Sequence, residues 1–238
     1  MNKLRKWSAI GSMALASMAA GSSAQAAFWD GFDTAGGPNP TRWEVANWAN
    51  GDIFGCTFAY SEAYQVNWGS LVLNVNGSNP SNVRCAEVRT FQSFTYGKFV
   101  TRMQPSYLQG ANSSFFLYTG TAGTSSHFEI DIEFLHGGSV IHTNVWRNGQ
   151  QNYVQYNTTN GWRTIGFEWR PTFIRWFHVN ANGSETEFRR VNVNISTPMR
   201  LMMNHWNGNN SANAKSFVGT YQAGTGGPAY YDWVRVDD

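Results

Sequence analysis

Charged residues are scarce in this chain of 238 residues: Asp, Glu, Lys and Arg make up 13% of it, about half of the roughly 25% usual in globular proteins. The sequence has 16% aromatic residues, including 11 Trp, and this balance excludes intrinsic disorder. The 24 Gly show no three-residue period and no heptad repeat occurs, which excludes collagen-like and coiled-coil classes. The length is ample for a large core.

The amino-terminal segment has the pattern of a secretory leader. Three basic residues within the first six positions precede an apolar, small-residue run over residues 7–20, and Ala24-Gln25-Ala26 forms an A-x-A cleavage site. The alternative is a membrane anchor, which the shortness of the apolar run disfavours. We therefore expect residues 1–26 to be a signal peptide that is removed, and residues 27–238 to form the mature protein.

Removing the leader changes the electrostatic class of the protein. The leader holds three basic residues and no acidic one, so the formal net charge falls from +2 to −1. A near-neutral chain has no electrostatic attraction for nucleic acid or anionic membranes. We expect a monomer that is secreted, either extracellular or periplasmic, and that binds neither nucleic acid nor, after cleavage, a membrane.

The chain has only two cysteines, Cys56 and Cys85. In an oxidising compartment two cysteines predict one disulfide, which would close a loop of about 30 residues and contribute about 3 kcal/mol in the chain-entropy model. A metal site is disfavoured because C-x-x-C spacing is absent, and the five histidines show no metal-ligand spacing.

A helical period of useful length is also absent from Phe28 onward, and short alternating or β-branched runs recur instead, separated by turn clusters. Many short strands without crossover helices indicate an all-β, antiparallel sandwich or barrel. No linker divides residues 27–238, which predicts a single domain. The expected strands are Ser70–Val75, Gly97–Gln104, Ser113–Tyr118, Phe128–Phe134, Val140–Trp146, Arg163–Trp169, Phe173–Val179, Leu201–His205 and Ala229–Val236.

The ten Trp of the mature chain exceed what the core of such a sandwich obviously needs. Each one taken singly is by default a core residue. The excess also suits a surface that stacks on sugar rings, and at this point both interpretations stay open.

The most informative run is Glu129-Ile130-Asp131-Ile132-Glu133. Residues i, i+2 and i+4 of a strand share a face, so the three carboxyl groups project together while the isoleucines point to the core. A solvated acidic edge is the alternative, although the wholly apolar opposite face indicates an inner strand. Glycoside hydrolysis uses such an arrangement, with one carboxylate as nucleophile and one carboxylic acid as proton donor.

This run, followed by Phe134-Leu135, resembles the signature of family 16 glycoside hydrolases. The spacing of one residue between Asp131 and Glu133 resembles that of the bacterial lichenases, which are endo-acting 1,3-1,4-β-glucanases. It also resembles that of the plant xyloglucan-active branch. The likeness extends over nearly the whole mature chain. It implies a β-sandwich of the jelly-roll type with a substrate cleft across its concave sheet.

The resemblance also implies roles for individual residues. Glu129 would be the nucleophile, Asp131 the assisting acid and Glu133 the general acid/base. Cys56 and Cys85 match the lichenase disulfide. No cofactor is expected for catalysis, but Gly31, Gly69 and Asp232 match a structural calcium site. The implied substrate-binding residues are Asn50, Glu87, Arg89, Phe116, Tyr118, Asn144, Trp146, Asn204 and Trp206.

Several positions depart from the lichenase pattern. Those enzymes usually have Trp, Asp and Tyr where this chain has His127, Phe128 and Trp146, and an apolar residue is common where it has His205. The two histidines are either sugar ligands or packing residues. The expected function is hydrolysis of mixed-linkage β-glucan with retention of configuration. The alternatives are an endo-glycanase or transglycosylase acting on an exopolysaccharide or xyloglucan, and a non-catalytic carbohydrate-binding jelly roll.

Overall fold

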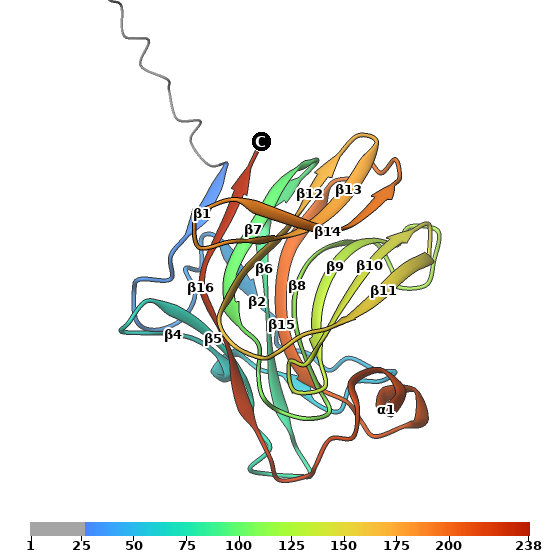
Figure 1. Ribbon diagram of the computed structural model, residues 1–238. Coiled ribbons are helices and arrows are strands. Elements are labelled where there is room, and N and C mark those ends of the chain that lie inside the picture. Colours follow the sequence, from blue (N-terminus) through green and yellow to red (C-terminus); the bar gives the residue numbers. More distant parts are fainter. Residues whose placement is uncertain (1–26) are drawn as a thin grey trace, which may run out of the picture.

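The computed structural model describes residues 27–238, which form two antiparallel β-sheets packed face to face (Figure 1). The all-β sandwich expected from the sequence is therefore confirmed. The expected signal peptide, residues 1–26, lies outside the described residues. Among the residues described, no helix is long and apolar enough to cross a membrane.

One sheet, here called the outer sheet, has the order β14-β13-β12-β7-β16-β5-β4, with β1 paired to β16. Its strands are β1 (Phe28–Asp30), β4 (Ala63–Val66), β5 (Ser70–Val75), β7 (Gly97–Gln104), β12 (Arg163–Arg170), β13 (Phe173–Val179), β14 (Glu185–Asn192) and β16 (Gly227–Asp237).

The other sheet, here called the carboxyl sheet, has the order β11-β10-β9-β8-β15-β6-β2, with the short β3 running parallel to β6. Its strands are β2 (Trp43–Val45), β3 (Thr57–Phe58), β6 (Arg84–Phe94), β8 (Ala111–Thr119), β9 (Phe128–Leu135), β10 (Val140–Arg147), β11 (Gln150–Asn157) and β15 (Met199–Asn207). Figure 1 shows β8, β9 and β10 side by side and curved.

The hydrophobic core lies between the two sheets and follows from the alternation of side chains along each strand. Phe99 and Phe167 of the outer sheet stack with ring centroids 5.1 Å apart, and Phe115 of the carboxyl sheet packs on Phe167 at 5.7 Å. All three are fully buried. The aromatic richness of the sequence is thus partly explained by the core, which also holds Trp43, Trp169 and Trp176.

All nine strand segments expected from the sequence are strands, but the structure also has β1, β2, β3, β4, β6, β11 and β14, which were not among them. The last two are edge strands whose residues are largely polar and exposed, so they carry no apolar alternation. One short helix was also missed, α1 (Ala212–Val218), which Ser211 caps by accepting a hydrogen bond from the Ala214 amide. The 3₁₀ turn η1 (Tyr60–Glu62) precedes β4.

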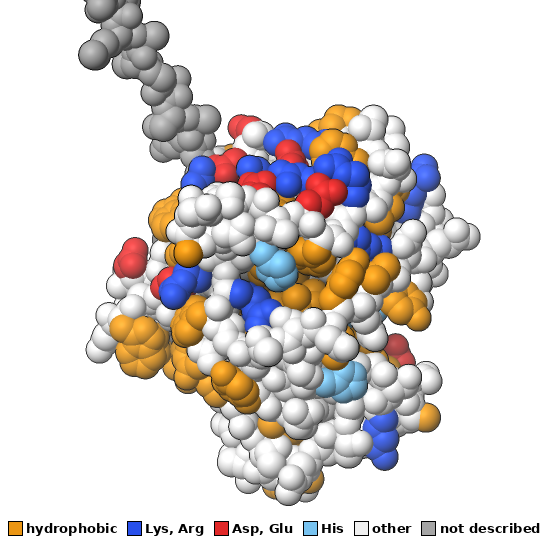
Figure 2. All heavy atoms as spheres, in the orientation of Figure 1, with side chains coloured by type: hydrophobic (Ala, Val, Ile, Leu, Met, Phe, Trp, Pro, Cys, Tyr) orange, Lys and Arg blue, Asp and Glu red, His pale blue; other side chains and the backbone are white. Residues whose placement is uncertain are grey.

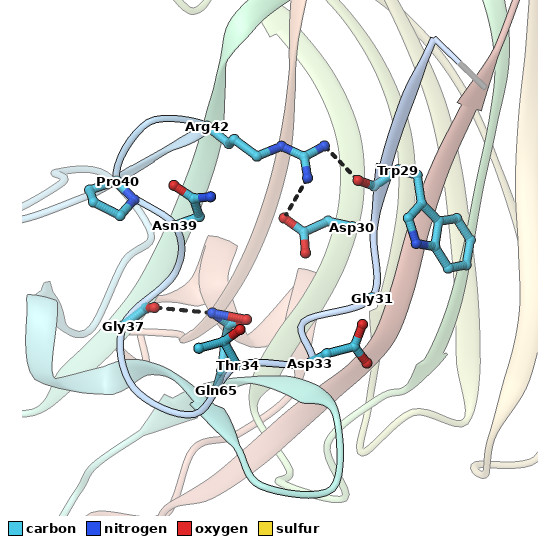
Figure 3. Close-up of a pocket in the computed structure, with 10 residues that line it drawn as sticks. All are labelled: Trp29, Asp30, Gly31, Asp33, Thr34, Gly37, Asn39, Pro40, Arg42 and Gln65. Carbon is cyan, nitrogen blue, oxygen red and sulfur yellow. Dashed lines mark hydrogen bonds and ion pairs between the residues drawn. The ribbon is translucent and has the colours of Figure 1, made fainter. Parts of the chain in front are cut away.

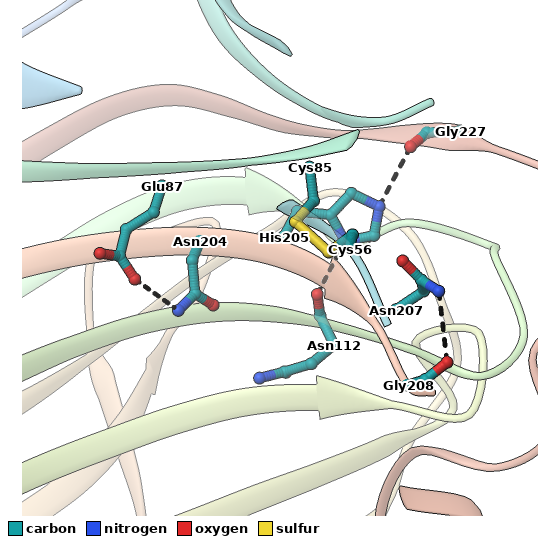
Figure 4. Close-up of a disulfide and its surroundings, with 9 residues drawn as sticks. All are labelled: Cys56, Cys85, Glu87, Asn112, Asn204, His205, Asn207, Gly208 and Gly227. Atoms are coloured by element: carbon teal, nitrogen blue, oxygen red, sulfur yellow. Dashed lines mark hydrogen bonds between the residues drawn. A yellow bond between two sulfur atoms is a disulfide. The ribbon is translucent and has the colours of Figure 1, made fainter. Parts of the chain in front are cut away.

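Cys56 and Cys85 form the expected disulfide, with Sγ atoms 2.04 Å apart. It joins the loop before β3 to β6, two residues before Glu87 (Figure 4). His205 lies on the core side of β15, where its Nδ1 is 2.7 Å from the Asn112 carbonyl and its Nε2 is 3.0 Å from the Gly227 carbonyl of the other sheet. Of the two roles considered for His205, the structure supports packing.

A group of the charged residues lies on the outer sheet. Figure 2 shows a band of acidic and basic side chains over β12, β13 and β14, where Arg175 pairs with Glu168 and with Glu185, and Arg190 pairs with Glu187. The Arg190–Glu187 pair is exposed and contributes little to stability.

Candidate active site

Glu129, Asp131 and Glu133 lie on β9 and face outward from the carboxyl sheet, as the alternation predicted. Ile130 and Ile132 point the other way and are fully buried in the core. The indole Nε1 of Trp176, from the outer sheet, donates a hydrogen bond of 2.9 Å to the Asp131 carbonyl. We call Glu129, Asp131 and Glu133 together the carboxyl ridge. Its middle residue is therefore anchored to the opposite sheet.

The register of β9 with its two neighbours places one side chain on each side of every carboxyl group, and directly paired residues share a face. The pairs are Glu129 with Tyr118 and Trp146, Asp131 with Phe116 and Asn144, and Glu133 with Ser114 and His142. Four of the expected sugar-binding residues thus adjoin the ridge.

Asp131 is the most enclosed of the three acids, with 3% of its surface exposed. Burial, reinforced by the neighbouring Glu129 and Glu133, raises the pKa of Asp131 well above its usual value. Its carboxyl group hydrogen bonds the Glu129 carboxylate. A neutral Asp131 is the donor in that contact because an ionised carboxylate has no proton to give.

Glu133 is kept protonated mainly by its surroundings. Burial, followed by the charge of Glu129, raises the pKa of Glu133 to about 8. The amide Nδ2 of Asn112 donates to Glu133 Oε1 at 2.7 Å and acts in the opposite direction, since it favours the carboxylate. At neutral pH, Glu133 is thus a carboxylic acid close to the pH at which it ionises.

His142 stands beside Glu133, with its Nε2 3.8 Å from Glu133 Oε2. Burial lowers the pKa of His142 to about 4, so the imidazole is neutral at pH 7. Gln155 Nε2 lies 3.2 Å from Nδ1 and donates to it. The ring packs between Tyr153 and Phe217, at centroid distances of 5.0 and 5.2 Å.

Glu87 and Asn204 face the same side from β6 and β15, where Asn204 Nδ2 donates to Glu87 Oε2 at 3.2 Å (Figure 4). Burial raises the pKa of Glu87 to about 7. Arg89 makes two hydrogen bonds to Glu44, at 2.7 and 3.1 Å, which is the main reason that the pKa of Glu44 falls to about 2. A sugar would meet Arg89 already held in place.

The remaining expected binding residues differ in accessibility. Asn50 is half-buried in the loop between β2 and β3. Asn144 is buried, and its Oδ1 accepts a hydrogen bond from the Asn152 amide at 3.1 Å. Trp206 is 3% exposed because Phe54 covers it, with ring centroids 4.2 Å apart. Phe54 therefore offers more of its ring to a ligand than Trp206 does.

The residues expected to bind calcium are only partly brought together. A Cβ placed on Gly69 would lie 3.8 Å from the Gly31 carbonyl oxygen and 3.2 Å from Asp33 Oδ1. Gly31 and Asp33 line a hollow of about 430 Å³ (Figure 3). Asp232 is instead paired with the Arg102 guanidinium at 2.5 Å. Over residues 27–238, no cluster of three or more His, Cys, Asp or Glu suits a metal.

Three residues near the ridge were not expected from the sequence as site residues: Asn112, His142 and Ser114. Their positions follow from the register of β8 and β10 with β9, which no local motif records. The alternation of Asn112, Ser114 and Phe116 along β8 was the one available signal, since a residue two positions from an expected ligand shares its face.

Two carboxyl groups on one strand face, one kept protonated by burial and the other receiving hydrogen bonds, form the arrangement that glycosidases use. Residues 50–235 match the glycosyl hydrolases family 16. The chain belongs to this family.

Individual relatives agree along most of the chain. It is 32% identical over 211 residues to a beta-glucanase of Bacillus subtilis, covering 86% of this chain and 84% of the relative. A Paenibacillus macerans beta-glucanase is also 32% identical, covering 83% of each chain.

Solved structures extend the likeness to the fold. The Bacillus licheniformis beta-glucanase superposes with a TM-score of 0.76 at 30% identity, covering 89% of this chain and 97% of the other. A prokaryotic beta-1,3-1,4-glucanase (lichenase) from a mouse hindgut metagenome has a TM-score of 0.75 at 32% identity, covering 88% and 98%. The expected jelly-roll architecture and family are thereby confirmed.

Proposed function

We propose that this protein is a secreted endo-acting hydrolase of mixed-linkage (1,3-1,4) β-glucan that retains the anomeric configuration. The observation that carries the proposal is the unequal state of the two glutamates on β9. Glu133 is a carboxylic acid at neutral pH, with a pKa raised to about 8 by burial. Glu129 accepts hydrogen bonds from Asp131 and His127, which suit a carboxylate.

In the first step, Glu129 attacks the anomeric carbon and Glu133 protonates the departing glycosidic oxygen. The new ester removes the negative charge of Glu129. That charge is one of the causes of the raised pKa of Glu133, so the proton affinity of Glu133 falls when the intermediate forms. Glu133, now a carboxylate, then acts as the base that takes a proton from water. The water oxygen attacks the anomeric carbon, and the Glu129 carboxylate leaves.

Asp131 supports the nucleophile through a hydrogen bond. Held neutral by burial, it donates its proton in a hydrogen bond to Glu129 while that group carries a charge. Glu87 and Asn204 on one side, and Tyr118 and Trp146 on the other, are suited to binding sugar hydroxyls and to stacking on sugar rings.

The preference for mixed-linkage glucan rests on the names of the relatives, among them a beta-1,3-1,4-glucanase. The substituted positions His127, Phe128 and Trp146 cluster at the Glu129 end of the ridge, so linkage preference is the part of the proposal that most needs a direct test.

The test is to digest a panel of polysaccharides and to size the products over time. Mixed-linkage β-glucan should be cut internally into short oligosaccharides, faster than β-1,3-glucan, cellulose, xyloglucan or an exopolysaccharide, and the Glu129→Ala variant should be inactive. Preferential digestion of another polymer would reassign the substrate. Products longer than the starting oligosaccharide would indicate transglycosylation.

We further propose a structural calcium ion bound by the Gly31 and Gly69 carbonyl oxygens with the Asp33 carboxylate. Oxygen donors of this kind suit calcium. The Gly31 carbonyl oxygen and the Asp33 carboxylate both lie close to Gly69, which supports this set, and Asp33 takes the place of the expected Asp232, which is paired with Arg102.

A further inference from the structure

His127 makes two directional contacts just before β9. Its Nε2 lies 2.7 Å from Glu129 Oε2. On the other side of the ring, Nδ1 accepts a hydrogen bond of 3.2 Å from the backbone amide of Gly123. The side chain is 3% exposed, so water does not compete for either nitrogen.

These two contacts fix the tautomer of the imidazole. Because Nδ1 accepts from a backbone N–H, it carries no proton, and the single proton of a neutral imidazole must be on Nε2. The Nε2–H group then donates to Glu129, whose carboxylate can only accept. His127 is therefore a neutral donor directed at this glutamate.

The ring is fixed on every side. It stacks on Trp146 with centroids 4.6 Å apart and lies 5.3 Å from the ring of Tyr118. Its backbone is tied at both polar groups, since the amide donates to the Thr124 carbonyl at 3.0 Å and the carbonyl accepts from the Gly149 amide at 3.2 Å. The donor is thus in place before any ligand binds.

The other titratable groups that face Glu129 are anionic when ionised. Asp131 and Glu133 come from the same strand, Glu87 from β6 and Tyr118 from β8. An ionised neighbour disfavours a second negative charge, whereas an N–H donor favours it. Of these four groups, neutral Asp131 donates a hydrogen bond to Glu129, and the Nε2–H group of His127 supplies a second donor.

We propose that His127 is a positioning residue for the nucleophile, and this inference rests on the proposed function of Glu129. Its Nε2–H group holds Oε2, which fixes the rotation of the carboxylate toward the anomeric carbon and favours its ionised form. No proton is transferred to or from His127 in either step. A residue that only filled space between Tyr118 and Trp146 would not need a nitrogen facing Glu129.

Two substitutions separate these roles. His127→Phe keeps a flat ring between Tyr118 and Trp146 but removes the donor, whereas His127→Gln places an amide N–H near the position of Nε2. His178→Phe is the matched control, because His178 stacks on Phe188 in the outer sheet, at 4.8 Å. All three should be compared with the wild type by melting temperature and by the pH profile of kcat/KM on an activated aryl β-glycoside.

We expect His127→Phe to lower kcat/KM about 10- to 100-fold and to move its acidic limb up by about one pH unit, since one unit corresponds to a tenfold change in proton affinity. His127→Gln should restore most of the rate and return the limb toward the wild-type position. Equal losses in both variants with an unmoved limb would overturn the proposal.

A measurement without substrate keeps this inference separate from the proposed function. In ¹⁵N-histidine-labelled protein, with His127→Phe used for assignment, His127 should show a protonated Nε2 and an unprotonated Nδ1 at pH 7, and Glu129→Gln should perturb the Nε2–H resonance. The Nδ1–H tautomer or an imidazolium would refute the positioning role. An enzyme inactive on every glycoside with the expected resonances would instead refute the proposed function.

Discussion

The hydrogen bond from Asn112 to Glu133 gives a quantitative test of how this fold sets the pKa of the proposed general acid. Asn112 Nδ2 donates to Oε1 at 2.7 Å and favours the ionised carboxylate, against the burial that raises the pKa of Glu133 to about 8. Asn112→Leu removes the donor at similar volume. The backbone carbonyl of residue 112, which contacts His205, is retained.

The expected shift follows from the strength of that contact. A hydrogen bond to a charged group contributes about 1.5–3 kcal/mol, and one pKa unit corresponds to about 1.4 kcal/mol. Because the lost bond stabilised the carboxylate, the pKa of Glu133 should rise by about one to two units, from about 8 toward about 9–10.

The assay is the pH dependence of kcat/KM on mixed-linkage β-glucan. The reaction needs protonated Glu133, so activity should be lost as pH rises through the pKa, and in Asn112→Leu this basic limb should move to higher pH. A 2,4-dinitrophenyl glycoside is the control, since its leaving group needs no proton and the limb should vanish for both proteins. A limb that stays in place or moves to lower pH would refute the reasoning.

Three further predictions concern the nucleophile, the disulfide and calcium. The rate of Glu129→Ala should fall by at least about 10³-fold, an order-of-magnitude expectation for removing a nucleophile. Added azide should give the α-glycosyl azide with Glu129→Ala and the β-glycosyl azide with Glu133→Ala. Swapped stereochemistry would exchange the two roles. Replacing Cys56 and Cys85 by Ala should lower the free energy of unfolding by about 3 kcal/mol, measured by urea denaturation, and an unchanged midpoint would contradict this. Chelation should lower the melting temperature of the wild type but not of Asp33→Ala, with little effect on turnover; equal melting curves with and without calcium would exclude the ion.

The parts of the molecule that the sequence predicted are those encoded by local alternation. The ridge of Glu129, Asp131 and Glu133 follows from a period of two within five residues, and the apolar faces of the inner strands follow from the same rule. Edge strands such as β11 and β14 lack a buried face and therefore lack that signal.

The contacts that tune the site depend on strand register, on packing between the sheets and on the conformation of a turn, so the alternation pattern did not predict them. Asn112 reaches Glu133 across the β8–β9 pairing. Trp176, from the other sheet, anchors the carbonyl of Asp131. The tautomer of His127 depends on a backbone amide four residues earlier, in a turn before β9. The sequence thus indicated which groups we propose to react, while the tertiary structure sets their surroundings.

The division of labour between two identical side chains on one strand is the central physical feature of this site. Glu129 and Glu133 are four residues apart on β9, and each has different neighbours. Beside Glu129 stands an imidazole with its N–H directed at the carboxylate. Beside Glu133 stands His142, also neutral but 3.8 Å away and packed against Phe217, so burial dominates and the acid form persists. Since the charge of Glu129 helps to hold the proton on Glu133, the two groups are coupled. In the proposed mechanism, forming the glycosyl ester at Glu129 therefore releases the base at Glu133.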